Sequence, residues 1–187
     1  MDNHTEFAVA VQDSNYLPTA EFTLTDDLIE VEYSEQAETE APGTYVWVAE
    51  RTECDPGFSE HTVIYIGEYG YTVKYRMNQH WSSWSNSTRS NQKMPEGKLQ
   101  KGDIIKQYLQ SGYTVKVYSK PSQVVHIPAP HPLRAFQTDV SDMLRLDTKS
   151  NDEAHLLEAF LQLYNNKPEL NGTKGSKGYI ITEGYNY

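Results

Sequence analysis

Cysteine is almost absent from this 187-residue chain, in which Cys54 stands alone. A single cysteine excludes a disulfide within the chain and a zinc site made only of cysteines. No apolar run approaches the roughly 20 residues that would cross a bilayer, and the first residues lack the basic-then-apolar order of a secretion signal. We therefore expect a cytoplasmic protein without membrane contact, built around one domain of ordinary size.

Basic side chains are scarce in the first third, so the net charge of −10 is unevenly spread. Residues 1–59 hold 14 acidic and 1 basic side chains, whereas residues 60–120 hold 9 basic and 4 acidic ones. Because a Debye length is only about 8 Å at physiological salt, the middle third can attract phosphates although the whole chain is acidic. A merely patchy surface would explain the same charges, and charge alone does not decide between the two.

Short apolar runs bounded by turn residues predict several strands. Residues 22–33 could supply one or two of them, and residues 44–49 and 62–67 read as a hairpin around the turn signal Asp55-Pro56-Gly57. A further strand is predicted at residues 113–119, followed by a proline-rich, irregular segment at 126–136.

Apolar residues spaced by three and four predict three helices, at residues 71–81, 102–112 and 151–166. The last is the strongest, because Leu156, Leu157 and Phe160 begin a continuous apolar stripe. Together with the strands, this order predicts an α+β domain with a small central, mostly antiparallel β-sheet flanked by helices.

Four pieces that could carry chemistry follow one another along these elements. The first hairpin strand begins Gly43-Thr44-Tyr45, and the second ends Tyr65-Ile66-Gly67. Arg76 and His80 lie on the next helix, and Glu158 lies on the last helix ahead of Asn171. Taken singly these would be ordinary strand tyrosines and surface helix residues. The ordered set is far more specific, and it resembles the GIY-YIG nuclease family, with GTY standing for GIY.

The resemblance covers residues 43–171 and implies the GIY-YIG nuclease fold for that domain. Residues 1–42 would then be an acidic N-terminal extension that mediates oligomer contacts or repels nonspecific DNA, and residues 172–187 a C-terminal tail. The activity implied is a metal-dependent endonuclease that hydrolyses phosphodiester bonds of double-stranded DNA. A homo-oligomer or sequential nicking would each serve a double-strand cut, and no residue pattern decides between them.

The resemblance also implies roles for single residues. Glu158 would hold one divalent cation, Mg²⁺ or Mn²⁺, which suits an ion that keeps several waters and takes one or two carboxylates. Arg76 would bind the scissile phosphate, and His80 would assist proton transfer or bind phosphate. Tyr45 is the candidate general base, with Tyr65 positioning water or phosphate. A phenol with a pKa near 10 needs a nearby cation to act as a base at neutral pH.

Contacts to nucleic acid are expected from residues around this site and in the tail. Asn171 would also steady the site by hydrogen bonds, and Lys174 belongs to a flexible basic stretch. The full set is Lys74, Trp84, Arg89, Asn171 and Lys174.

Other motifs do not carry a function. The run Asp152-Glu153-Ala154-His155 spells a helicase box, but the chain lacks the phosphate-binding loop that a helicase also needs. His126 and His131 have no neighbouring carboxylate or cysteine that would complete a zinc site. Two rivals to the nuclease remain open: a catalytically silent nucleic-acid-binding protein with the same fold, and an acidic protein-interaction module.

Overall fold

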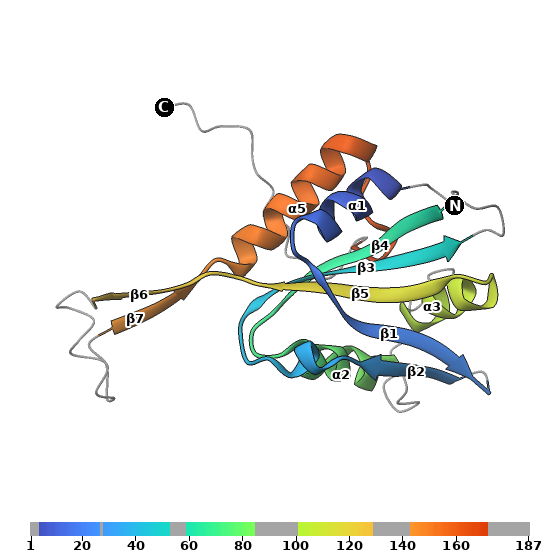
Figure 1. The fold of residues 1–187 in the computed structure, drawn as a ribbon, viewed down its shortest axis with the longest axis horizontal. Coiled ribbons are helices and arrows are strands. Elements are labelled where there is room, and N and C mark those ends of the chain that lie inside the picture. Colours follow the sequence, from blue (N-terminus) through green and yellow to red (C-terminus); the bar gives the residue numbers. More distant parts are fainter. Residues whose placement is uncertain (1–3, 27, 53–58, 85–100, 129–142, 172–187) are drawn as a thin grey trace.

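The computed structural model describes residues 4–26, 28–52, 59–84, 101–128 and 143–171. Its centre is a five-stranded sheet in the order β2-β1-β5-β3-β4, in which every neighbouring pair is antiparallel (Figure 1). The strands are β1 (Leu17–Thr25), β2 (Leu28–Tyr33), β3 (Gly43–Thr52), β4 (Ser59–Tyr69) and β5 (Thr114–Pro121).

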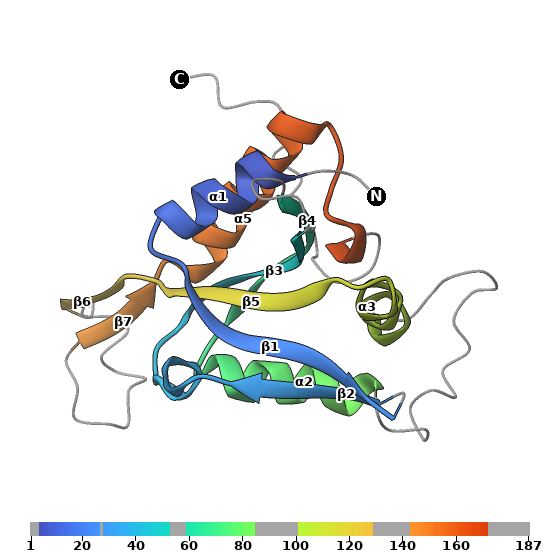
Figure 2. The ribbon, with the colours of Figure 1, turned by 45° about the vertical axis from the view of Figure 1, so that its right-hand side comes forward.

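Helices cover both faces of this sheet, because side chains along β3 and β4 alternate between two apolar cores (Figure 2). Val46 and Val48 pack with Phe7 of α1 (Thr5–Asp13) and Phe160 of α5 (Lys149–Tyr164). On the opposite face, the core that contains Tyr45 and Trp47 also holds apolar residues of α2 (Val73–Trp84) and α3 (Lys101–Gln110). Short 3₁₀ helices, η1 (Glu35–Glu38) and η2 (Glu169–Asn171), complete the described elements.

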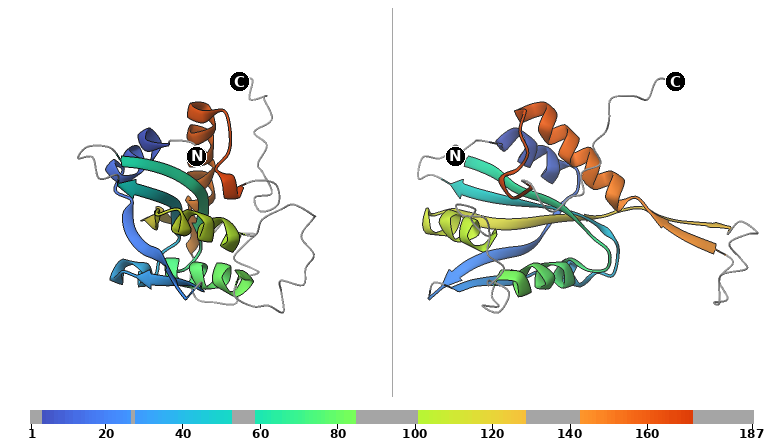
Figure 3. Two further views of the ribbon diagram at one scale, coloured as in Figure 1. Left: turned by 90° about the vertical axis from the view of Figure 1, so that its right-hand side faces the viewer. Right: turned by 180° about the vertical axis from the view of Figure 1, so that it is seen from behind.

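A two-stranded ribbon of β6 (Val124–Pro128) and β7 (Met143–Asp147) extends away from the sheet (Figure 3). Its base is fixed at two points. The Ser122 amide donates to the Pro42 carbonyl over 2.9 Å, and the Thr148 hydroxyl donates to the Asp152 carboxylate over 2.8 Å.

The predicted α+β class and antiparallel sheet are confirmed, and the hairpin of β3 and β4 is where the sequence places it. The predicted helices correspond to α2, α3 and α5. Two features differ. β6 includes residues 126–128 of the segment 126–136 that was expected to be irregular, and α1 was not expected at all. The Asp55-Pro56-Gly57 turn lies outside the described residues.

Residues 1–42 were expected to form an acidic extension of the domain. In the structure, β1 and β2 of this segment belong to the central sheet. β1 lies between β2 and β5, and Phe7, Ala8 and Val11 of α1 are buried against β3 and β4. The acidic side chains therefore belong to the surface of the folded domain. Among the described residues, no helix combines the length and apolar character needed to span a membrane.

Candidate active site

The β3–β4 hairpin brings the two predicted tyrosines together on the face covered by α2 and α3. Tyr45 is paired across the strands with Gly67, and Trp47 with Tyr65. A Cβ atom at Gly67 would lie 2.6 Å from the Tyr45 hydroxyl and 2.9 Å from the Tyr65 ring. The glycine of the Tyr-Ile-Gly triplet is therefore required because the Tyr45 ring lies directly on its backbone.

Helix α2 carries Arg76 and His80 to the same place. Thr72 caps the helix by accepting a hydrogen bond from the Tyr75 amide over 3.0 Å. Val73 and Met77 are buried against the sheet, and Arg76 and His80 each follow one of them by three residues. Residues three and four apart share a helix face, so both polar side chains point toward the hairpin.

Tyr45 and His80 are within hydrogen-bonding distance, with the Tyr45 hydroxyl 2.8 Å from Nε2 of His80. Burial, then the cations of Lys101 and Arg76, lower the pKa of His80 to about 3, so its imidazole is neutral. Burial, then Tyr65, raise the pKa of Tyr45 well above its ordinary value. The phenol thus keeps its proton.

Arg76 is partly buried beside both phenols, and Tyr45 and Tyr65 each interact with its charge. One guanidinium nitrogen, Nη1, donates to Gln79 Oε1 over 3.1 Å. Its Nε is buried and has no hydrogen-bond partner among the described residues. A buried N–H without an acceptor is costly, and an incoming phosphate oxygen would satisfy it.

Lys101, at the start of α3, belongs to the same site and was not singled out in the sequence. Its ammonium nitrogen lies 3.6 Å from the centroid of the Tyr65 ring, a cation–π contact. Burial, then the charge of Arg76, lower the pKa of Lys101 to about 8, against the opposing effect of Glu153. Two cations therefore converge on one half-buried position.

The carboxylate that faces these cations is Glu153 of α5, also not singled out. Burial, then the charge of Glu68, raise the pKa of Glu153 to about 7, while Arg76 and Lys101 oppose that shift. The first turn of α5 is held beside the end of β4, where Ser150 Oγ donates to Glu68 Oε2 over 2.6 Å. We call Tyr45, Tyr65, Arg76, His80, Lys101 and Glu153 the hairpin cluster.

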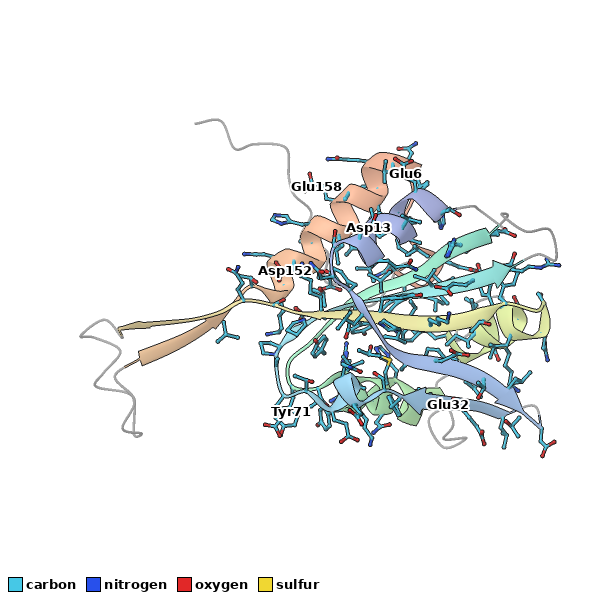
Figure 4. The ribbon with its side chains drawn as sticks, viewed as in Figure 1. Glu6, Asp13, Glu32, Tyr71, Asp152 and Glu158 are labelled. Carbon is cyan, nitrogen blue, oxygen red and sulfur yellow. The ribbon has the colours of Figure 1, made fainter. Side chains whose placement is uncertain are left out.

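The structure does not bring Glu158 to the hairpin cluster. Its side chain is exposed, and Oε1 accepts a hydrogen bond from Gln162 Nε2 over 3.4 Å. Five helical residues separate Glu158 from Glu153, which turns the two carboxylates about 140° apart around the helix axis. Figure 4 shows Glu158 on the outer side of α5, away from the sheet.

Asn171 lies at the edge of β4 and steadies the site by hydrogen bonds. Its Oδ1 accepts from the Ile66 amide over 2.8 Å, and its Nδ2 donates to the Ile66 carbonyl over 2.7 Å. Asn171 is buried, so the side chain acts as a short substitute for a neighbouring strand. Both ends of the amide are engaged with β4, and a contact of this residue with nucleic acid stays a prediction.

The other expected nucleic-acid contacts are placed only in part. Lys74 forms an ion pair with Glu38 of η1, and its ammonium lies 5.7 Å from the centroid of the Tyr33 ring. Trp84 ends α2, and its side chain lies outside the described part of the chain, as do Arg89 and Lys174.

Within the described residues, no group of three or more His, Cys, Asp or Glu side chains converges. Zinc, which takes four protein ligands in structural sites and three in catalytic ones, is therefore not indicated in that part. A half-buried carboxylate such as Glu153 fits an ion that keeps most of its waters.

The chain thus folds as an antiparallel sheet with helices on both faces, an α+β fold that it shares with a nuclease of known structure. The chain is similar to the structure of a mutant of bacteriophage T4 EndoII, a GIY-YIG nuclease, with a TM-score of 0.52 and 14% identity over 87% of this chain and 96% of that one. It is also similar to the restriction endonuclease HPY188I in complex with product DNA, with 15% identity over 93% of this chain and 87% of that one, but the TM-score of 0.43 is too low to bear on the fold. No family model and no curated protein matches the sequence.

Proposed function

We propose that this protein is a metal-dependent endonuclease that hydrolyses phosphodiester bonds of double-stranded DNA at the hairpin cluster. The observation that carries the proposal is the unsatisfied Nε of Arg76, buried among two phenols and a second cation. Such a donor is prepared for an anionic oxygen, and the endonuclease-like fold makes a phosphodiester the natural anion.

Arg76 and Lys101 bind the scissile phosphate in this account. The guanidinium offers a planar pair of donors to two phosphate oxygens, and the ammonium adds a compact charge on the same side. Both are partly buried, so their attraction for a phosphate is screened less by salt than that of a surface lysine. Charge that develops on the phosphate oxygens during hydrolysis is stabilised by the same two groups.

Glu153 replaces Glu158 as the residue that would hold the cation, Mg²⁺ or Mn²⁺. When bound, such an ion lowers the pKa of a coordinated water and neutralises charge on the leaving oxygen. A carboxylate with a pKa of about 7 is only partly charged at neutral pH in the protein alone. A bound cation would favour the charged form of Glu153 and so lower the pKa of this carboxyl.

Tyr45 and His80 together provide the path for the proton. Tyr45 cannot serve as a free phenolate, since burial raises its pKa well above the ordinary value. A phosphate bound to Arg76 and Lys101 offsets the two charges that help to lower the pKa of His80. With the phosphate in place, Tyr45 can pass its own proton to Nε2 of His80 while it takes one from the attacking water, so that no phenolate forms. Tyr65, beside Tyr45, holds the water and the phosphate in line.

The test is cleavage of a supercoiled plasmid with Mg²⁺, with EDTA as the metal-free control. Wild type should nick or linearise the plasmid, and Arg76→Ala should be slower by about 100-fold or more. Arg51→Ala is the matched control, because Arg51 is an exposed arginine of β3 whose guanidinium lies 5.8 Å from the Tyr113 ring centroid. Binding of DNA without any Mg²⁺-dependent or Mn²⁺-dependent cutting would overturn the enzyme and leave the silent binding protein.

A further inference from the structure

Two large aromatic side chains, Tyr71 and Tyr75, are exposed beside the hairpin cluster. Tyr71 exposes 51% and Tyr75 57% of its surface. Their ring centroids lie 6.4 Å apart at an interplanar angle of 89°, so the two rings are perpendicular and enclose a corner. We call this pair the aromatic corner, and Figure 4 labels Tyr71.

The corner is held in place although its rings are exposed. The Tyr71 hydroxyl donates to the Glu40 carboxylate, and the Ala41 amide donates to the Tyr71 carbonyl over 2.8 Å. Tyr75 lies in the first turn of α2, where its amide donates to the Thr72 hydroxyl. A rigid aromatic surface loses little conformational entropy when a ligand binds.

A hollow of about 290 Å³ joins the corner to the hairpin cluster. The hollow is lined by Tyr71, Tyr75 and Gln79 and by Arg76, the proposed phosphate ligand. Glu68, whose charge contributes to the raised pKa of Glu153, completes the rim. A group bound in this hollow would therefore lie next to the phosphate that Arg76 holds.

We propose that the aromatic corner binds a nucleobase of the cleaved strand that is unstacked from its neighbours. This base belongs to the nucleotide that adjoins the scissile phosphate. This inference rests on the proposed nuclease function. The sugar–phosphate chain fixes the distance between a base and its own phosphate, so Arg76 and the corner can hold two parts of one nucleotide. An aromatic face binds any base by stacking, which makes the site tolerant of sequence.

The chemistry of the hollow favours a nucleobase over an apolar side chain of a protein. Its lining combines aromatic faces with the charges of Glu68 and Arg76 and the amide of Gln79, groups that can pair with the polar edge of a base. The core of a protein–protein interface is, by contrast, depleted of charged residues.

The test uses the full chain and a DNA duplex in which the wild-type cut has first been mapped. An abasic residue is moved across that cut one position at a time, and binding is measured in EDTA by fluorescence anisotropy. Removal of the one base that stacks should weaken wild-type binding about 5- to 100-fold. Tyr75→Ala should weaken binding to the intact duplex by a similar factor and should lose sensitivity to the abasic position.

Two variants serve as controls. Tyr75→Phe keeps the ring and should bind like wild type, whereas Leu163→Ala removes an exposed apolar side chain of α5 and should change nothing. The base-binding proposal is refuted if binding does not depend on the abasic position and Tyr75→Ala binds like wild type. If the plasmid is still cut, the proposed nuclease function is unaffected by that result. If Tyr75→Ala loses self-association and binding does not depend on the abasic position, the corner is a protein-docking surface. This outcome also refutes the base-binding proposal. A wild type that neither cuts nor binds DNA instead refutes the proposed function.

Discussion

The hydroxyl of Tyr45 lies 2.8 Å from Nε2 of His80, where the tyrosine is buried and the histidine is partly buried. This contact joins the β3–β4 hairpin to α2 at the point where Arg76 is also held. It pairs a phenol that keeps its proton with an imidazole that is neutral. A proton that Tyr45 gives to His80 leaves an imidazolium, so the transfer depends on the bound phosphate and on the proton that Tyr45 takes from water in the same step.

Tyr45→Phe removes this hydrogen bond and leaves the ring packing. We expect cleavage to fall about 100-fold, the usual contribution of a positioned proton acceptor, with a smaller loss of stability. The measurement is kcat/KM beside thermal unfolding. Tyr113→Phe is the control, since it removes a phenol that donates to Glu60 over 2.9 Å. An equal loss of activity in both variants would refute the proton path.

Gly67→Ala places a methyl group 2.6 Å from the Tyr45 hydroxyl, and the rigid ring has no room to move away. Overpacking of this kind costs about 1–3 kcal/mol of folding free energy, and it should displace Tyr45 from His80 and abolish cleavage. Gly70→Ala is the control for stability, because a Cβ there meets nothing within 4 Å. Denaturant unfolding compares the two variants, and similar midpoints would contradict the close approach of Tyr45 to β4.

Asn171→Ala leaves the Ile66 amide and carbonyl without partners at the edge of β4. Unsatisfied buried groups cost about 1–3 kcal/mol each, so the melting temperature should drop by about 5–15 °C in a chain of this length. Asn171→Asp keeps the acceptor for the Ile66 amide but repels the carbonyl, and its loss should be intermediate or greater. A melting temperature within a degree of wild type would show that the clamp contributes nothing.

Lys101→Met should stabilise the protein at neutral pH. In the folded chain Lys101 loses its proton at a pKa of about 8, whereas an unfolded lysine keeps it to about pH 10.4. The unfolded state therefore binds more protons between these values, and wild-type stability rises with pH across that window. The gain from Lys101→Met, measured by metal-free thermal unfolding at pH 7 and pH 10, should shrink at the higher pH.

Lys106→Met, on the same helix, is the matched control for loss of one positive charge. If the two variants show the same change between pH 7 and pH 10, the half-buried placement of Lys101 against Tyr65 is wrong.

Tyr45, Tyr65, Arg76 and His80 were found through the resemblance of the ordered set to a nuclease family, and local rules explain why they meet. Strand pairing sets Tyr45 against Gly67, and helix spacing sets Arg76 and His80 beside the buried Val73 and Met77. The β6–β7 ribbon and α1 were not predicted, because no local sequence pattern marks either of them. Within the described residues β7 pairs with β6 alone, and α1 is a short helix that packs on β3 and β4.

Glu153 and Lys101 were missed although the sequence holds a signal for each. Glu153 precedes Leu156, Leu157 and Phe160 by three, four and seven residues, so it continues the apolar stripe of α5. Lys101 stands in the same relation to Ile104, Ile105 and Tyr108 of α3. A charged residue in phase with an apolar stripe points toward the sheet. Glu158 is out of phase with its stripe, and that difference separates the two carboxylates.

The most direct measurement is plasmid cleavage against Mg²⁺ concentration for Glu153→Gln and Glu158→Gln, two identical changes on one helix. Glu153→Gln should lose cleavage by about 100-fold or more, and wild-type affinity for Mg²⁺ should rise as pH passes through about 7, the pKa of Glu153. Glu158→Gln should cut like wild type. Full activity in Glu153→Gln with loss in Glu158→Gln would contradict the account at its centre.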